Sequence, residues 1–323
     1  MNNRRRQWLN RFAASAGLLT ARASLAQTSE PKKVLPAKVL TAPDLSTQNL
    51  PAQVLPTTLL QFPRDFGSHP NYRTEWWYIS GWLDVGSSAS VASGSPSAGS
   101  MGFQITFFRT RTGLRTDNPS LFTPRQILFA HIALSQGGSR TLLHDQLSAR
   151  AGFGLAQSSE ADTDVVIKNW QLIRSANDVY SARCATLSGG PKQQFGLNIT
   201  LTPPGPPQLQ GDAGFSRKGP NIAQASHYYS RPQMAVQGDL TLKGSTQTIT
   251  GRAWLDHEWS STLLDPQAVG WDWIGINLNN GGSLLAFRLR KSDGANVWTH
   301  VADRKSTRLN SSHRNTSRMP SSA

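Results

Sequence analysis

The 323-residue chain has a single cysteine, Cys184, so no disulfide can form within it. No histidine or basic cluster lies beside Cys184 to activate its thiol, and we interpret it as a packing residue. A glycine-rich phosphate loop, a serine nucleophile elbow and closely spaced histidine or cysteine ligands are also missing. These absences argue against phosphate-loop, serine-hydrolase and zinc chemistry. We therefore expect no cofactor and no metal.

Long apolar runs are scarce as well. The run from Phe12 to Ala21 is too short to span a bilayer, and no later run reaches that length. Twin arginines, Arg5 and Arg6, precede it, and small residues follow it at the spacing of a cleavage site. We interpret residues 1–26 as a twin-arginine-like export signal and expect a periplasmic or secreted protein. A basic tail is the alternative.

The net charge of +14 comes mostly from the two ends of the chain. Residues 1–26 carry five arginines and no acid, and residues 303–323 carry five basic residues and one acid. The remaining body has 23 basic and 18 acidic residues, which is an ordinary globular balance. Nucleic acid is therefore not expected as a partner.

Residues 303–323 do not resemble natural protein sequence. The string DRKSTRLNSSH, followed by SRMPSSA, resembles the translation of a sequencing adaptor. We interpret this segment as an artefact that replaces the natural continuation after Ala302, which would leave the C-terminal part incomplete. A natural serine-rich basic tail is the alternative.

Between residues 58 and 302 the chain shows strand patterns and no sustained helical spacing. Residues 73–83 are aromatic and β-branched, and residues 195–202 alternate between apolar and polar. The segment 280–282, Asn-Gly-Gly, predicts a hairpin turn. About ten short strands of this kind predict an antiparallel barrel or sandwich.

The body is longer than one small barrel needs. Residues 27–60, rich in Pro, Ala, Thr and Gln, are typical of a linker. A proline-rich stretch, 203–207, ends a predicted strand, and we place a domain boundary after it, near Gly219 to Pro232. We therefore expect a first domain over 61–225 and a second over 226–302.

The segment 253–259 carries the densest chemistry of the chain. On a strand, Trp254, Asp256 and Glu258 would share one face, and the residues between them would share the other. The two carboxylates would lie roughly 6–7 Å apart at Cα. His257 would point away from both, so the three side chains could not bind one metal ion on a regular strand.

Other aromatic and ionisable residues could line a cavity with this segment, since pockets favour domain interfaces. Ordinary core packing is the alternative for each of them. The candidate ligand-binding residues are Glu75, Trp76, Trp77, Tyr78, His227, Tyr228, Tyr229, Trp254, Trp259, Trp271, Asp272 and Trp273.

Five motifs resemble one known family. They are Glu75-Trp76-Trp77-Tyr78, Gly102-Phe103-Gln104 with Phe107-Phe108-Arg109, His227-Tyr228-Tyr229-Ser230, Trp254 to Trp259 and Gly270-Trp271-Asp272-Trp273. In this order they resemble the lipocalin-like secreted proteins of the AttH type, which are related to carotenoid 1,2-hydratase. The resemblance implies an all-β protein of two lipocalin-like antiparallel barrels packed together, the second one truncated here.

The resemblance leaves two functions open. In a hydratase, Asp256, His257 and Glu258 form the catalytic group, and Asp256 acts as the acid that protonates an alkene of an apolar ligand. In a non-catalytic carrier, the same cavity holds a lipid-like molecule, and transporter components are the expected partners. Peripheral contact with a membrane is compatible with both.

Overall fold

The computed structural model describes residues 50–86, 99–114, 119–136, 142–186, 194–262 and 264–304. Their regular structure is antiparallel β-strand apart from one short 3₁₀ helix, η2 (Arg64–Phe66). The all-β prediction is thus confirmed. In the described part of the chain, no helix has the length and hydropathy to cross a membrane. The predicted export signal, most of the linker and residues 305–323 lie outside the described residues.

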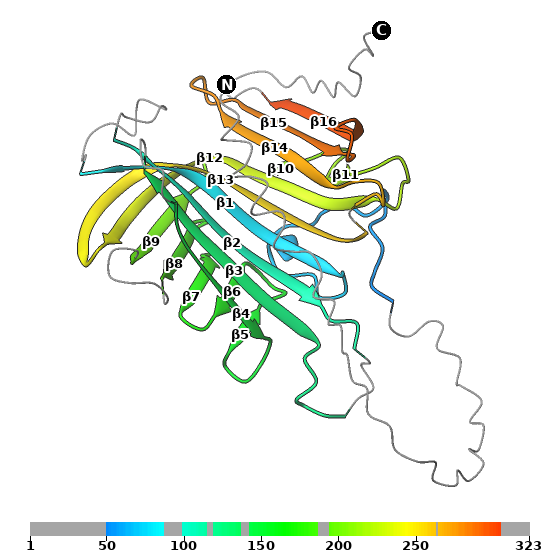
Figure 1. The fold of residues 1–323 in the computed structure, drawn as a ribbon, viewed down its shortest axis with the longest axis horizontal. Coiled ribbons are helices and arrows are strands. Elements are labelled where there is room, and N and C mark those ends of the chain that lie inside the picture. The colour runs from blue at the N-terminus through cyan, green and yellow to red at the C-terminus, as the bar shows by residue number, and fades with distance from the viewer. Residues whose placement is uncertain are drawn as a thin grey trace, which may run out of the picture. The chain divides into compact units, whose positions relative to one another are not determined.

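The larger sheet has thirteen strands within the described residues and curls into a nearly closed barrel (Figure 1). Its main path runs through β4 (Leu142–Arg150), β3 (Gln126–Gln136), β2 (Met101–Arg111), β1 (Thr74–Val85), β13 (Ser245–Thr262), β12 (Ala225–Leu242), β9 (Phe195–Thr202), β8 (Tyr180–Ala185), β7 (Trp170–Arg174), β6 (Asp164–Ile167) and β5 (Ala156–Ser158). Two short strands, β10 (Gln208–Leu209) and β11 (Phe215–Arg217), pair with β12. The ends of the path, β4 and β5, follow one another in the chain, and an isolated bridge pairs Gly152 of their connection with Ala156 at the start of β5.

The barrel is filled by side chains from the inward face of each strand. On β1, Trp77, Ile79 and Leu83 are fully buried in this core, as the alternation of the sequence predicts. Gly81 lies on the same face where β1 and β13 approach closely. A Cβ atom there would lie 2.2 Å from the carbonyl oxygen of Arg252, so only glycine fits.

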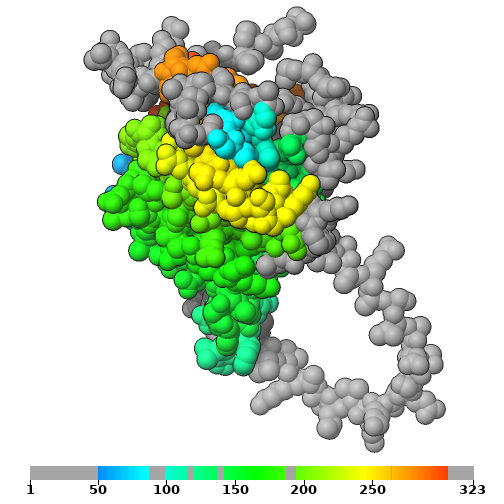
Figure 2. Space-filling view, turned by 90° about the vertical axis from the view of Figure 1, so that its left-hand side faces the viewer, coloured from blue at the N-terminus to red at the C-terminus, as the bar shows by residue number. Residues whose placement is uncertain are grey.

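The two longest strands, β12 and β13, form a hairpin that extends along the barrel. Figure 2 shows this hairpin in yellow beside the cyan residues of β1. A register shift interrupts the β12–β13 pairing between Arg231 and Met234. Gln233 lies in this bulge with a positive φ of 60°, and its amide and side chain bond to the turn region of the second sheet.

The smaller sheet consists of β14 (Gly270–Asn277), β15 (Ser283–Arg290) and β16 (Asn296–Arg304). It packs on the outward face of β12 and β13, where Tyr228 and Trp254 join Leu285, Phe287 and Leu289 in a second apolar core. The predicted hairpin at 280–282 is confirmed, and Gly281 adopts a positive φ of 81° in its turn.

The predicted boundary between residues 225 and 226 does not match the sheets. β12 and β13 lie between β9 and β1, so residues 225–262 belong to the larger sheet. The chain changes sheet only after Thr262, before β14 begins at Gly270. The proline-rich stretch ends β9 as predicted. The chain then returns to the same sheet, where β12 pairs with β9.

Candidate functional site

The segment 253–259 lies on β13, and its side chains alternate as predicted. Asp256 is opposite Tyr78 of β1 and points to the outward face with Trp254 and Glu258. His257 is opposite Trp77 and points into the barrel. The three ionisable residues therefore belong to two separate clusters, one on each face of the sheet.

Asp256 is the centre of the outward cluster. The residue is only 3% exposed, and its Oδ1 atom accepts hydrogen bonds from the Ser230 hydroxyl at 2.5 Å and the Trp254 indole at 2.7 Å. Burial raises the pKa of Asp256 to about 7, since the hydrogen bonds from Ser230, Trp254 and Tyr228 offset only part of that effect. Asp256 therefore holds a transferable proton near neutral pH.

Aromatic side chains from both sheets surround this carboxyl group. Trp273 of β14 packs edge-on against Trp254 at 5.9 Å and against Tyr78 at 5.6 Å between ring centroids. Its indole nitrogen donates to the Tyr228 hydroxyl at 3.2 Å. Burial raises the pKa of Tyr228 well above its ordinary value, so its hydroxyl stays protonated. The acid thus lies in an aromatic environment formed where the sheets meet.

Glu258, the second carboxylate of this face, is occupied by an ion pair. Lys218 lies 2.7 Å from its Oε1 atom, and Ser226 also donates to that oxygen. The ammonium group of Lys218 also lies over the rings of Phe287 at 4.1 Å and Tyr228 at 4.6 Å. Glu258 is therefore a paired carboxylate that adds only a minor charge effect at Asp256.

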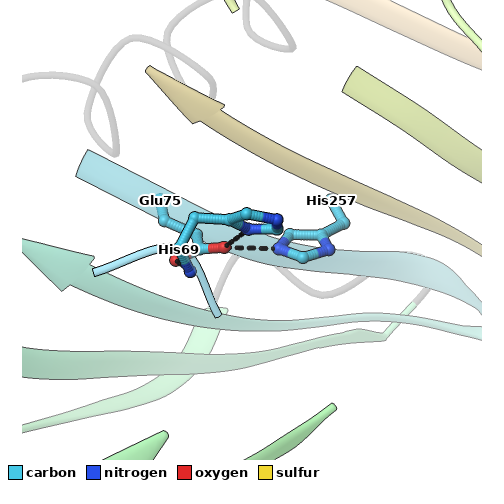
Figure 3. A group of neighbouring side chains, drawn as sticks. All are labelled: His69, Glu75 and His257. Atoms are coloured by element: carbon cyan, nitrogen blue, oxygen red, sulfur yellow. Dashed lines mark hydrogen bonds and ion pairs between the residues drawn. The ribbon is translucent and has the colours of Figure 1, made fainter. Parts of the chain in front are cut away.

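The inward cluster centres on Glu75, which is fully buried (Figure 3). Its Oε1 atom lies 2.7 Å from Nδ1 of His69 and 2.8 Å from Nε2 of His257. Its Oε2 atom accepts from the Arg109 guanidinium at 2.8 Å and from the backbone N–H of His69 at 2.8 Å. Both oxygens of Glu75 are thus fully used.

The bonding pattern defines where the protons lie. His69 touches carboxylates with both ring nitrogens, Glu75 on one side and Asp65 at 3.1 Å on the other. Burial alone would lower the pKa of His69, but the charges of Glu75 and Asp65 and the hydrogen bonds to both carboxylates together outweigh it, and the pKa is raised. Burial lowers the pKa of His257 to about 4, so its ring is neutral and Nε2–H donates to Glu75. Burial would raise the pKa of Glu75, but the His69 charge and its other partners hold it well below its ordinary value.

The predicted ligand-binding residues are divided between these clusters. Tyr78, Tyr228, Trp254 and Trp273 face Asp256, whereas Glu75, Trp77, Tyr229 and Trp259 surround His257. His257 therefore does not reach Asp256, contrary to the expected catalytic group of three, because neighbouring residues of a strand face opposite sides.

Three other predicted residues lie apart from both carboxyl groups, whereas Trp76 is partly buried on β1, opposite Glu258 of β13. Trp271 is 44% exposed, and Asp272 forms ion pairs with Arg288 and Arg290 on the second sheet. His227 is buried near Trp259, and neither of its ring nitrogens has a hydrogen-bond partner among the described residues.

Sequence reasoning missed His69, Asp65, Arg109 and Lys218 as site residues. His69 and Asp65 precede the first strand, in a segment where the only visible signal is a short spacing of ionisable residues before Glu75.

Asp256, His257 and Glu258 were not expected to bind one metal ion together, because His257 would point away from the two carboxylates. The alternation of side chains along β13 has this arrangement. Among the described residues, one cluster of metal-ligand type occurs elsewhere, formed by His69, Glu75 and His257.

A nearly closed antiparallel barrel, with a second sheet packed over buried acid and aromatic residues, defines a lipocalin-like β-barrel protein. The sequence model of the AttH-like family matches residues 53–317. The crystal structure of an AttH-type protein from Nitrosomonas europaea is 43% identical, with a TM-score of 0.68, and the match covers 79% of this chain and 72% of that chain. This chain therefore belongs to the AttH-like family, and the predicted resemblance is confirmed.

A second solved structure shares the fold alone. Kievitone hydratase from Nectria haematococca is 12% identical with a TM-score of 0.51, over 76% of this chain and 65% of that chain. Among curated proteins, none matches this chain.

Proposed function

We propose that this protein hydrates an isolated alkene in an apolar, terpenoid-like ligand, with Asp256 as the general acid. The observation that carries the proposal is a buried carboxyl group with a pKa of about 7 in an aromatic environment. Protonation of an alkene needs an acid that keeps its proton at neutral pH and loses it at the reacting carbon. Asp256 has both the burial and the neighbours for that task.

The reaction balances with one water molecule. The Asp256 carboxyl group gives its proton to one alkene carbon, and the π electrons form the new C–H bond and leave a cation on the other carbon. Water adds to that cation, and the proton it releases returns to the Asp256 carboxylate. Because Oδ1 already accepts from Ser230 and Trp254, the transferable proton belongs on Oδ2.

The aromatic faces around Asp256 suit the cationic intermediate. Indole and phenol rings attract a cation through the negative charge density of their faces. Trp254, Trp273 and Tyr228 supply such rings within one packed cluster. The fold shared with kievitone hydratase supports the proposal as an analogy.

Isotope labelling tests the reaction directly. The purified chain, incubated with acyclic terpenoid alkenes in H₂¹⁸O, is expected to yield a tertiary alcohol that carries ¹⁸O, because water supplies the hydroxyl oxygen. Gas chromatography with mass spectrometry detects the product. A chain that binds these alkenes and returns them unchanged would contradict the hydratase and favour the carrier.

A specific surface favours the second candidate, a carrier that collects an apolar ligand at a membrane. Two neighbouring turns expose Leu121, Phe122 and Phe153, with exposed fractions of 83%, 73% and 58%. The rings of Phe122 and Phe153 stack at 5.4 Å, and Phe153 holds a strained positive φ of 57°. Arg150 bonds to the backbone of Leu121 and Phe122 and lies over the Phe153 ring. An apolar tip with a guanidinium beside it suits an anionic lipid surface.

We therefore expect the chain to bind vesicles that contain about 30% phosphatidylglycerol in phosphatidylcholine. The double variant Phe122→Ser/Phe153→Ser is expected to bind about tenfold more weakly or worse, because two phenyl rings no longer enter the interface. Co-sedimentation measures the partitioning. Ile222→Ser, at a residue 59% exposed in a different loop, is the matched control. Equal binding by the double variant and the control would rule out this membrane surface.

A further inference from the structure

The inward cluster has the composition and arrangement of a metal centre. His69 precedes β1, Glu75 is on β1 and His257 is on β13, so three separate parts of the chain meet at one point (Figure 3). We propose that His69, Glu75 and His257 form a binding site for a divalent transition-metal ion of the Zn²⁺ or Fe²⁺ class. This site lies on the opposite face of β13 from Asp256 and is independent of the proposed hydratase reaction.

The donor atoms suit such an ion. Two imidazole nitrogens and one carboxylate oxygen lie within 4.8 Å of one another. The Glu75 Oε1 atom is 2.7 and 2.8 Å from the two nitrogens. An ion with bonds of about 2.0–2.2 Å would require these atoms to separate by only about half an ångström. Two histidines and one carboxylate are a donor set used by both zinc and non-haem iron.

Each donor is oriented by a second partner, as ligands of metal centres usually are. The other ring nitrogen of His69 contacts Asp65 at 3.1 Å, and that of His257 contacts the Tyr229 hydroxyl at 3.0 Å. Arg109 holds the other oxygen of Glu75 at 2.8 Å. These contacts use only the atoms that would not bind the ion. The three atoms that would bind the ion are Nδ1 of His69, Nε2 of His257 and Oε1 of Glu75. Their hydrogen bonds within the described cluster are made to one another.

The hydrogen-bonded form and the metal-bound form differ by a proton. In the hydrogen-bonded form, Glu75 accepts N–H bonds from both imidazoles. An ion would displace the proton on Nδ1 of His69. The proton on Nε2 of His69 would stay, hydrogen-bonded to Asp65. His257 would carry its proton on Nδ1, which the Tyr229 hydroxyl can accept. Every outer contact therefore survives the exchange.

Aromatic rings enclose the site and fix the imidazoles. The His69 ring stacks on Trp259 at 3.6 Å with an interplanar angle of 6°, and the His257 ring stacks on Trp77 at 4.6 Å. Such walls limit rotation of both ligands. A bound ion there would tie the segment before β1 to the two strands β1 and β13, in addition to the hydrogen bonds already present.

Titration of the purified full chain with Zn²⁺, after treatment with a chelator, tests the site. We expect one Zn²⁺ per chain by calorimetry, and Co²⁺ is expected to give the visible absorption of a low-coordinate N/O site. Tyr229→Phe and Asp65→Asn keep all three ligands and are expected to weaken binding about 10- to 100-fold. His257→Asn is expected to abolish it. His144→Asn, at an exposed histidine, is the control and should bind as the original chain does.

Two results would overturn the proposal. One is an original chain that takes up no stoichiometric Zn²⁺ or Co²⁺, which would leave the cluster as a hydrogen-bonded core. The other is binding that is unchanged in Tyr229→Phe and Asp65→Asn but lost in His144→Asn, which would place the ion on surface histidines. Because Tyr229→Phe removes a single oxygen and no charge, it also tests the site if His257→Asn does not fold.

Discussion

Replacing Glu75 with glutamine is expected to lower the free energy of unfolding by about 3–5 kcal/mol. Glu75 is fully buried between Arg109 and the protonated His69. Glutamine keeps the shape of the side chain but removes the charge that compensates both cations. His69 can release its proton in response, but the Arg109 guanidinium cannot, so a buried charge remains without its partner. Chemical denaturation of the full chain measures the loss.

The matched control is Asp272→Asn. Asp272 also pairs with two arginines, Arg288 and Arg290, but it is about a third exposed. Exposed ion pairs contribute about 0–1 kcal/mol, so the control should cost no more than that. Equal costs for Glu75→Gln and Asp272→Asn would mean that the inward cluster is not an ion network that stabilises the barrel.

The same cluster predicts how stability depends on pH. The pKa of Glu75 is held below its ordinary value of 4.5, so its contribution is present above that value and is lost as the pH falls through the folded-state pKa. The pKa of His69 is raised above 6.5, so its contribution is present below 6.5 and is lost as the pH rises through the raised value. Between pH 4.5 and pH 6.5, the ordinary pKa values of the two groups, Glu75 and His69 therefore both contribute fully to stability.

The second large effect is on turnover. Asp256→Asn is expected to lower the hydration rate by about 100-fold or more, because an amide cannot donate the acidic proton. The same change should not destabilise the chain at neutral pH, since the amide oxygen still accepts from Ser230 and Trp254 and an amide, unlike the carboxyl, has no ionised form that favours the unfolded chain. Product formation by mass spectrometry and a melting curve on the same sample separate the two effects.

The pH profile adds an independent check on Asp256. Its pKa of about 7 predicts that hydration falls as the pH rises above 7, because the acid loses its proton. Stability should also fall between the ordinary carboxyl value of 3.8 and about 7, where only the folded state holds this proton, and Asp256→Asn should remove that slope.

Glu258→Gln is the control for Asp256→Asn, because it breaks the buried pair with Lys218 and leaves the proton donor in place. It should destabilise the chain more than Asp256→Asn while retaining the pH dependence. A costly Asp256→Asn with unchanged turnover would instead identify Asp256 as a structural carboxylate.

Local sequence patterns determined much of the strand structure. The segments around β1, β9 and β13 were predicted from aromatic and alternating residues, and the 280–282 turn from its glycines. The separation of Asp256 from His257 onto opposite faces also followed from the sequence, because side chains of a strand alternate strictly. A regular backbone imposes these properties within a few residues.

Only the tertiary structure decided which strands and side chains meet. The pairing of β1 with β13 joins residues far apart in the chain, and it brings Tyr78 beside Asp256 and Trp77 beside His257. His69 and Lys218 reach their carboxylates from segments outside these two strands, and no local pattern distinguishes them from surface residues. The sequence also did not show that the chain passes from the larger sheet to the smaller one after Thr262, because no local pattern marks that step. Alternation determines the direction of a side chain, whereas its partners depend on long-range pairing, which a pattern of neighbouring residues does not encode.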